Sequence, residues 1–180
     1  MKLSTLFKAS MISLMLASVQ NVTAAQTVTP AIDSSIVSEI NTKLANDSAL
    51  SGFHLDVTSH KGVVMLSGKV DTQNEAMKAI ELAQSVPEVV DVKSKGLMAK
   101  DSHQPFTDSA ITAKVKGTYI REKLFGDKDI ELTGIKVETT NGIVYLTGKV
   151  DTEQQAKNAV HFAQSVSGVK EVKSSLEVSA

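Results

Sequence analysis

One eleven-residue segment of this chain occurs twice. Gly62–Thr72 (GVVMLSGKVDT) returns as Gly142–Thr152 (GIVYLTGKVDT), 80 positions later (142 minus 62). Each copy is rich in apolar and β-branched residues, begins at a glycine, and ends at a threonine that can start a helix. This pattern predicts a central strand that follows a tight turn and leads directly into a helix. Two such units predict two copies of one small α/β fold.

The residues before each copy predict a helix and a hairpin. In the first copy, Asp33 or Ser34 is expected to cap a helix whose apolar residues recur every four positions, and the polar run 46–52 ends it. Alternating residues at 55–57 predict a strand that turns at 60–62 into the central strand. Asn-Gly at the matching turn of the second copy favours a hairpin with positive φ.

The residues after each copy predict a capped helix and a final strand. Thr72 and Glu75 fit a capping box, and Thr152 with Gln155 repeats the arrangement. The helices carry many alanines on one face, as expected of helices that lie close to a sheet. Strand, helix and strand in one sheet imply a right-handed crossover between parallel strands. The predicted class is therefore α+β: two αββαβ domains, each a three-stranded sheet with two helices on one face.

The two copies occupy residues 33–98 and 108–178, joined by a polar linker at 99–107. The offset between them is 75 in the first helix (111 minus 36) and 80 at the hairpin glycine (142 minus 62). Five residues have therefore been added between Val115 and Val137, in or just after the helix. A duplicated fold with one altered element suggests that this element has a separate role.

Residues 1–25 have the features of a secretory signal peptide. Lysines at positions 2 and 8 precede a short apolar run at 9–19, and small residues allow cleavage after Ala24 or Ala25. An amphipathic helix that belongs to the fold is the alternative reading. Residues 26–32 are expected to form a polar spacer. These features predict that the chain is exported.

Composition removes several classes of function. There is no cysteine, so a lipid-bearing cysteine, a disulfide and a thiol nucleophile are excluded. Without the signal, 17 basic residues (19 minus 2) face 20 acidic ones. This balance argues against nucleic-acid binding through overall charge.

No constellation of catalytic or ligand-binding residues is apparent. Residues 62–69 resemble a phosphate-binding loop, but five residues separate the glycines instead of four, and Val70 replaces the Ser or Thr that would meet magnesium. The four histidines lack the spacing of a metal site. We therefore expect no catalytic residues, no metal, no cofactor and no small-molecule substrate.

The core Gly-x-Val-x-Leu-Ser/Thr-Gly-x-Val, the alanine-rich capped helix, and the stretches 108–115 and 137–148 resemble the BON domain family. The similarity covers nearly the whole mature chain and is closest to two-domain periplasmic members. It implies an αββαβ fold, a periplasmic location, no catalysis, and roles in stress tolerance and envelope integrity. It also implies either chaperone-like help to exported or envelope proteins, or binding to anionic phospholipid. The lipid-anchoring cysteine of the family's lipoprotein branch is absent.

The first helix of the second copy is the candidate binding element. Between Ile111 and Gly126 the net charge is +3, with Glu122 as the one acid, whereas the chain as a whole is acidic. Apolar anchors beside lysines are typical of a helix that binds an anionic membrane surface. The candidate lipid- or partner-binding residues are Lys114, Lys116, Tyr119, Ile120, Arg121, Lys123 and Phe125.

A purely structural reading of this helix remains open. Its apolar residues Ile111, Val115, Ile120 and Leu124 would then face the core, and its basic residues would be solvated. Exposure of both Tyr119 and Phe125 would favour binding, since an exposed aromatic pair has no structural explanation.

Overall fold

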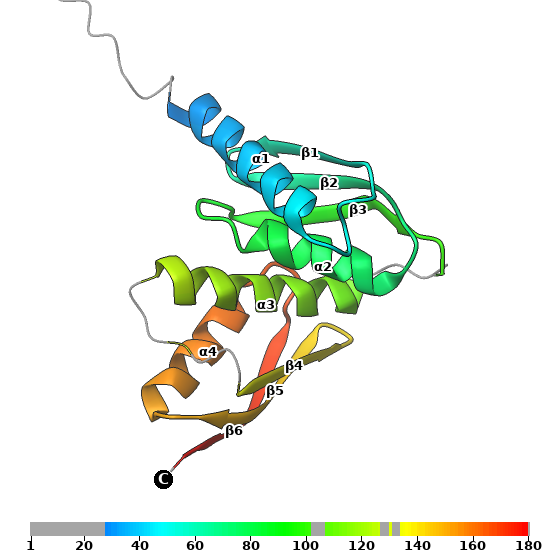
Figure 1. Ribbon diagram of the computed structural model, residues 1–180. Helices are drawn as coiled ribbons and strands as arrows, with labels where there is room; N and C mark the ends of the chain where they lie inside the picture. The colour runs from blue at the N-terminus through cyan, green and yellow to red at the C-terminus, as the bar shows by residue number, and fades with distance from the viewer. Residues whose placement is uncertain (1–27, 102–106, 127–129, 131–133, 180) are drawn as a thin grey trace, which may run out of the picture.

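The computed structural model describes residues 28–101, 107–126, 130 and 134–179 of the chain. Two domains of the same topology follow one another (Figure 1). The first contains α1 (Val28–Asn46), β1 (Leu55–His60), β2 (Val63–Val70), α2 (Gln73–Gln84) and β3 (Asp91–Ala99). The second contains α3 (Thr107–Phe125), β4 (Ile135–Thr140), β5 (Ile143–Val150), α4 (Glu153–Ser165) and β6 (Glu171–Val178).

Each domain has a three-stranded sheet with the hairpin and the crossover expected from the sequence. The strand orders are β1-β2-β3 and β4-β5-β6, so the duplicated segment supplies the central strand of both sheets. β1 pairs with β2 antiparallel, with Val57 opposite Leu66, and β2 pairs with β3 parallel, with Val64 opposite Val92. The second domain repeats both pairings. The predicted αββαβ order is confirmed.

Both helices of a domain cover the same face of its sheet. Along β2, Val64 and Leu66 are buried while Met65 between them is exposed. The two buried residues share one apolar core with Ile40 of α1 and Ile80 of α2. Each such side chain stabilises the fold by roughly 1.5–3 kcal/mol when it leaves water.

An aspartate from the first helix clamps the hairpin in each domain. Asp33 accepts the Lys61 and Gly62 amides at 2.8 and 3.0 Å and the Ser59 hydroxyl at 2.6 Å. Asp108 accepts the Asn141 and Gly142 amides at 2.8 and 2.9 Å. The first amide of each pair belongs to a residue with positive φ, as a two-residue hairpin requires.

The structure corrects two expectations about the first helix. α1 begins at Val28 and so takes in most of the expected spacer at 26–32. Pro30 lies in its first turn, where the missing amide would have no helical partner anyway. Asp33 is therefore inside the helix and does not cap it. Its carboxylate binds the hairpin 28 and 29 residues further on.

The predicted capping box is confirmed in α2, and in α4 the predicted threonine cap is confirmed. The Glu75 amide donates to Thr72 Oγ1, and the Thr72 amide donates back to Glu75 Oε2 at 2.9 Å. In α4 the Gln155 amide donates to Thr152 Oγ1, while Gln155 Oε1 accepts from the Asp151 amide.

The five added residues of the second domain divide between helix and connection. α1 ends 13 residues after Asp33, whereas α3 ends 17 residues after Asp108, which is one turn more. The connections that follow are 47–54 and 126–134, so the second is longer by one residue. The extra turn carries α3 past the point where its counterpart stops. The expected signal peptide at 1–25 lies outside the described residues, as does most of the linker at 99–107.

Candidate binding surface on helix α3

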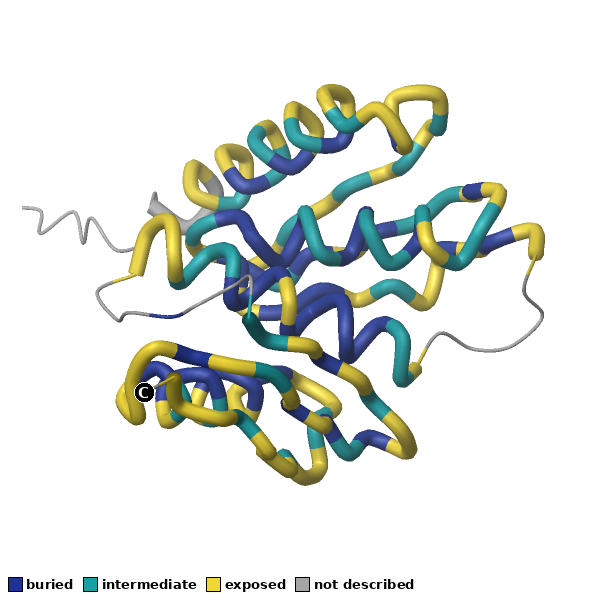
Figure 2. The backbone as a smooth tube through the Cα atoms, turned by 60° about the horizontal axis from the view of Figure 1, so that its bottom comes forward, coloured by how far each residue is buried: buried dark blue, intermediate teal, exposed yellow. Residues whose placement is uncertain are grey.

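Helix α3 lies between the two domains and contributes to both (Figure 1). Ala110 and Ala113 belong to the apolar core of the first domain. Ile111, Val115 and Tyr119 belong to the core of the second. Residues 110–115 and 117–119 of this helix are buried, and Figure 2 draws buried residues in dark blue. The helix therefore has two buried faces, one for each domain.

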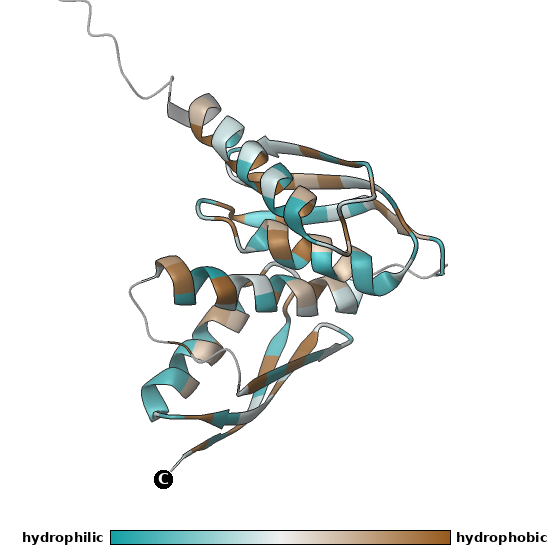
Figure 3. Ribbon diagram, in the orientation of Figure 1, coloured by the Kyte–Doolittle hydropathy of each residue, from teal (hydrophilic) through white to brown (hydrophobic). Residues whose placement is uncertain are grey.

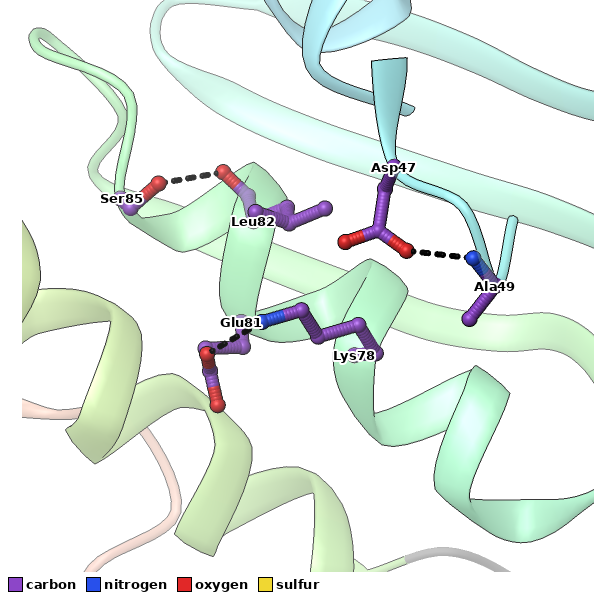
Figure 4. Close-up of polar contacts among 6 residues, drawn as sticks. All are labelled: Asp47, Ala49, Lys78, Glu81, Leu82 and Ser85. Atoms are coloured by element: carbon purple, nitrogen blue, oxygen red, sulfur yellow. Dashed lines mark hydrogen bonds and ion pairs between the residues drawn. The ribbon is translucent and has the colours of Figure 1, made fainter. Parts of the chain in front are cut away.

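The contact between α3 and α2 depends on small residues. A Cβ atom at Gly117 would lie 2.4 Å from the Glu81 carbonyl oxygen and 2.8 Å from Gln84 Cβ, so only glycine allows the two helices to approach this closely. Figure 4 shows the last turns of α2, where Lys78 pairs with Glu81 and the Ser85 hydroxyl donates to the Leu82 carbonyl. Ser85 is buried by the fold, and this bond satisfies its hydroxyl.

A buried ion pair joins the domains beside this contact. Lys114 Nζ lies 2.9 Å from Asp91 Oδ1 and donates to the Ser167 carbonyl at 2.8 Å. Asp91 Oδ2 also lies 2.6 Å from Lys93 Nζ. Burial acts to raise the pKa of Asp91, but the hydrogen bonds from Lys93 and Lys114 outweigh it, and the pKa is lowered overall. The carboxylate is therefore charged and held between two lysines.

Tyr119 is a core residue of the second domain. It is 2 % exposed, and its hydroxyl donates to the Ala159 carbonyl of α4 at 2.8 Å. Burial raises the pKa of this phenol well above its ordinary value. Its ring is therefore not available to an external ligand.

The guanidinium of Arg121 also has its partners within the molecule. Its Nη1 donates to the Val89 carbonyl at 2.6 Å, and its Nε lies 3.1 Å from Glu122 Oε1. The first of these bonds ties α3 to the segment that precedes β3. The guanidinium thus stabilises the relative position of the domains.

The remaining candidates lie on the solvent side or at the end of α3. Lys116 and Lys123 are exposed, and Ile120 is half-buried. Leu124 and Phe125, in the added turn, are 61 % and 56 % exposed. Figure 3 shows this apolar end of the helix.

The seven predicted residues therefore fall into two groups. Lys114, Tyr119 and Arg121 hold the domains and their cores together. Lys116, Lys123 and Phe125 are exposed to solvent, with Ile120 at the boundary. Of the two aromatic residues expected to discriminate between binding and structure, one is buried and one is exposed.

The purely structural interpretation of the helix placed Leu124 in the core, and the sequence did not single out Val90, although both residues are strongly exposed. Val90 is 70 % exposed and follows Val89, whose carbonyl binds Arg121. Leu124 and Phe125 stand three and four positions after Arg121, on the same side of the helix. We call Leu124 and Phe125 the apolar tip. Leu124 continues the apolar spacing of the helix, four positions after Ile120, so the pattern gave no sign of its exposure; no signal pointed to Val90 either.

The described residues carry no other site of evident chemistry. Among them, no three His, Asp or Glu side chains are grouped as metal ligands would be. Within the same residues, no helix combines the length and the apolar character needed to cross a bilayer.

Comparison with known proteins gives one consistent family. The BON domain family matches residues 32–97 and 107–180. Osmotically-inducible protein Y of Escherichia coli (strain K12) is 33% identical over 150 residues, which are 81% of this chain and 72% of that protein. Outer membrane lipoprotein DolP of Haemophilus influenzae is 34% identical over 124 residues, 66% of this chain and 59% of that protein.

A solved structure is also similar, but weakly. The C-terminal domain of CdsD, described as the structural protein of the type III secretion system of Chlamydia trachomatis, gives a TM-score of 0.34 at 18% identity. That match covers 82% of this chain and 67% of the other.

Proposed function

Since this chain belongs to the BON domain family and carries two copies of the domain, we propose that it is a non-enzymatic, stress-related binding protein of the periplasm. In this role it shields apolar segments of exported or envelope proteins. The names of its relatives, an osmotically-inducible protein and an outer membrane lipoprotein, support a role in the stressed envelope.

The apolar tip is the surface that we assign to this binding. One observation carries the assignment: Leu124 and Phe125 are 61 % and 56 % exposed at the end of a helix whose other apolar residues are largely buried. They stand in a turn that the first domain lacks. Large apolar side chains that gather on an otherwise polar surface mark contact sites more often than isolated ones do.

A tip of this kind fits an apolar segment of an incompletely folded protein. It offers a leucine and an aromatic ring at the end of a helix that packs against both domains. A rigid apolar anchor binds with little loss of conformational entropy. The expected ligand is therefore an extended apolar segment, without a demand for one sequence.

Anionic phospholipid is the second candidate ligand, favoured by a specific observation. Lys116 and Lys123 are exposed on the same helix as the tip. Apolar anchors beside lysines suit the surface of an anionic bilayer, where each lysine contributes about 1 kcal/mol. In this case the tip enters the headgroup region while the lysines meet phosphates.

Suppression of client aggregation tests the leading proposal. Light scattering of a reduced, unfolding client protein is followed with wild type, with Leu124→Ser/Phe125→Ser, and with Met65→Ser/Met98→Ser as a matched control. The control removes two equally exposed apolar side chains from the open sheet of the first domain. We expect the tip variant to lose suppression and the control to retain it. Equal suppression by all three proteins would refute the assignment.

Flotation with vesicles tests whether the protein binds anionic phospholipid. Wild type and Lys116→Glu/Lys123→Glu are mixed at low salt with vesicles of phosphatidylglycerol or of phosphatidylcholine. Arg121 is left unchanged because it binds the Val89 carbonyl. Flotation with the anionic vesicles alone, lost in the variant, supports lipid binding. No flotation of the wild type would exclude it.

A further inference from the structure

The two domains have the same fold, but the contact between α3 and α2 uses a different surface of each domain. A surface on the first helix of one domain meets a surface on the second helix and third strand of the other. A contact between two different surfaces can repeat from one chain to the next and form an open filament. From the residues at the unused copies of these surfaces, we infer that Glu39 and Thr42 prevent this chain from associating head to tail with a second copy of itself.

The duplication identifies the residues that a second contact would use. Asp33 and Asp108 clamp equivalent hairpins, so positions in α3 correspond to positions in α1 that are 75 lower. Lys114 therefore corresponds to Glu39, and Gly117 to Thr42.

The receiving surface is matched in the same way. Thr72 and Thr152 begin equivalent helices, so positions there differ by 80. Asp91 therefore corresponds to Glu171, and Glu81 to His161.

Both unused surfaces are open. On α1, the positions equivalent to the buried stripe of α3 are small, polar and exposed: Ser35, Ser38 and Thr42. On α4, the positions equivalent to the covered face of α2 are also exposed: His161, Gln164 and Ser165. Both surfaces are therefore accessible to a second chain.

Charge opposes this association. Inside the chain, one carboxylate, Asp91, lies between Lys93 and Lys114. In the intermolecular contact, Glu39 would face Glu171. Lys43 lies 4.0 Å from Glu39 on its own helix, and Lys173 is two positions after Glu171 on its own strand. Each lysine would then come from the same chain as its carboxylate, so no ion pair like that of Lys114 and Asp91 would cross the contact, and two carboxylates would face each other.

Backbone sterics oppose it as well. At Gly117 a Cβ would lie 2.4 Å from the carbonyl oxygen of Glu81, a distance that no side-chain movement relieves. Thr42 places a branched Cβ at the equivalent position, toward the carbonyl of His161. The two helices therefore cannot reach the spacing seen between α2 and α3. Terminal units of repeat proteins block further stacking in a similar way.

The double variant Glu39→Lys/Thr42→Gly tests this inference. Its mass is followed by sedimentation velocity over a wide range of protein concentration, with wild type alongside. We expect wild type to remain a single chain, and the variant to form species that grow with concentration. Circular dichroism shows whether glycine, which costs a helix about 1 kcal/mol, leaves the fold intact.

Two further variants give a decisive result even if glycine weakens the helix. Glu39→Lys/Thr42→Ala removes the charge conflict but keeps a Cβ, so it should associate far less than the glycine variant. Adding Glu171→Lys to the glycine variant places lysines opposite each other and should restore the single chain. A well-folded glycine variant that stays monomeric, or a wild type that already forms chains, would overturn the inference. So would association that Glu171→Lys does not reverse.

Discussion

Lys114 Nζ lies 2.9 Å from Asp91 Oδ1, and this pair joins the first helix of the second domain to the last strand of the first. Both side chains are almost completely buried, and Lys114 also donates to the Ser167 carbonyl. Three segments far apart in the sequence therefore meet at one ammonium group. The predictions below follow from this junction and from the residues around it.

Replacing Lys114 with methionine should destabilise the protein strongly. The change leaves Asp91 buried with the half-exposed Lys93 beside it, and removal of one member of a buried pair costs about 3 kcal/mol. Urea unfolding measures the loss. The double variant Lys114→Met/Asp91→Asn should recover part of it, because no uncompensated charge then remains. Equal losses in the single and double variants would contradict this account.

Stability should fall in acid because of Asp91. Its pKa is lowered in the folded protein, since the hydrogen bonds from Lys93 and Lys114 outweigh the effect of burial. The contribution is therefore complete above the unfolded value of about 3.9 and is lost as the pH falls through the lower folded value. Urea midpoints between neutral pH and strong acid give the profile, and Asp91→Asn should flatten it. Asp33, whose pKa the Gly62 amide and the Ser59 hydroxyl lower, should account for part of the remaining slope.

Gly117→Ala should destabilise the contact between the domains. The added Cβ meets the Glu81 carbonyl oxygen at 2.4 Å, so the helices must separate. Overpacking of this kind costs about 1–3 kcal/mol, against a gain in helix propensity of about 1 kcal/mol. Gly52→Ala is the matched control, because no atom lies within 4 Å of its added Cβ. The free energy of unfolding should therefore be lower for Gly117→Ala than for Gly52→Ala.

Tyr119→Phe should lower stability by about 1 kcal/mol, the usual net value of one buried hydrogen bond. The bond lost is the one from the hydroxyl to the Ala159 carbonyl. Because burial raises the pKa of this phenol, the difference between wild-type and variant absorbance during an alkaline titration should stay flat until the protein unfolds. A titration step in the native range would show that Tyr119 is accessible to solvent.

Local features of the fold were predictable because their signals are short-range. The capping box at Thr72, the positive φ at Gly142, and the strand that follows each hairpin are all specified within a few residues. The change of offset between copies also located the added turn of α3. Asp33 was misassigned because a carboxylate near a helix start usually caps it, whereas here its partners lie in the distant hairpin.

The role of α3 was harder to foresee. A helix with one buried face shows one apolar stripe, but α3 is buried on two sides, and its second face consists of Ala110, Ala113 and Gly117. Small residues give weak hydrophobic periodicity. Nothing near Lys114 in sequence indicated Asp91, which is 23 positions away. The basic residues of this helix therefore suggested a surface, although two of them hold the molecule together.

Because one helix completes two cores, the tandem cannot be divided into independent halves. A polypeptide ending at Lys100 would leave Gln84, Ser85 and the carboxylate of Asp91 facing water, without the helix that covers them. A polypeptide beginning at Thr107 would retain its own core but expose Ala110, Ala113 and an ammonium group without its carboxylate. Fusion after duplication thus made each half depend on the other, and a protease that cuts between them would release two weakened fragments.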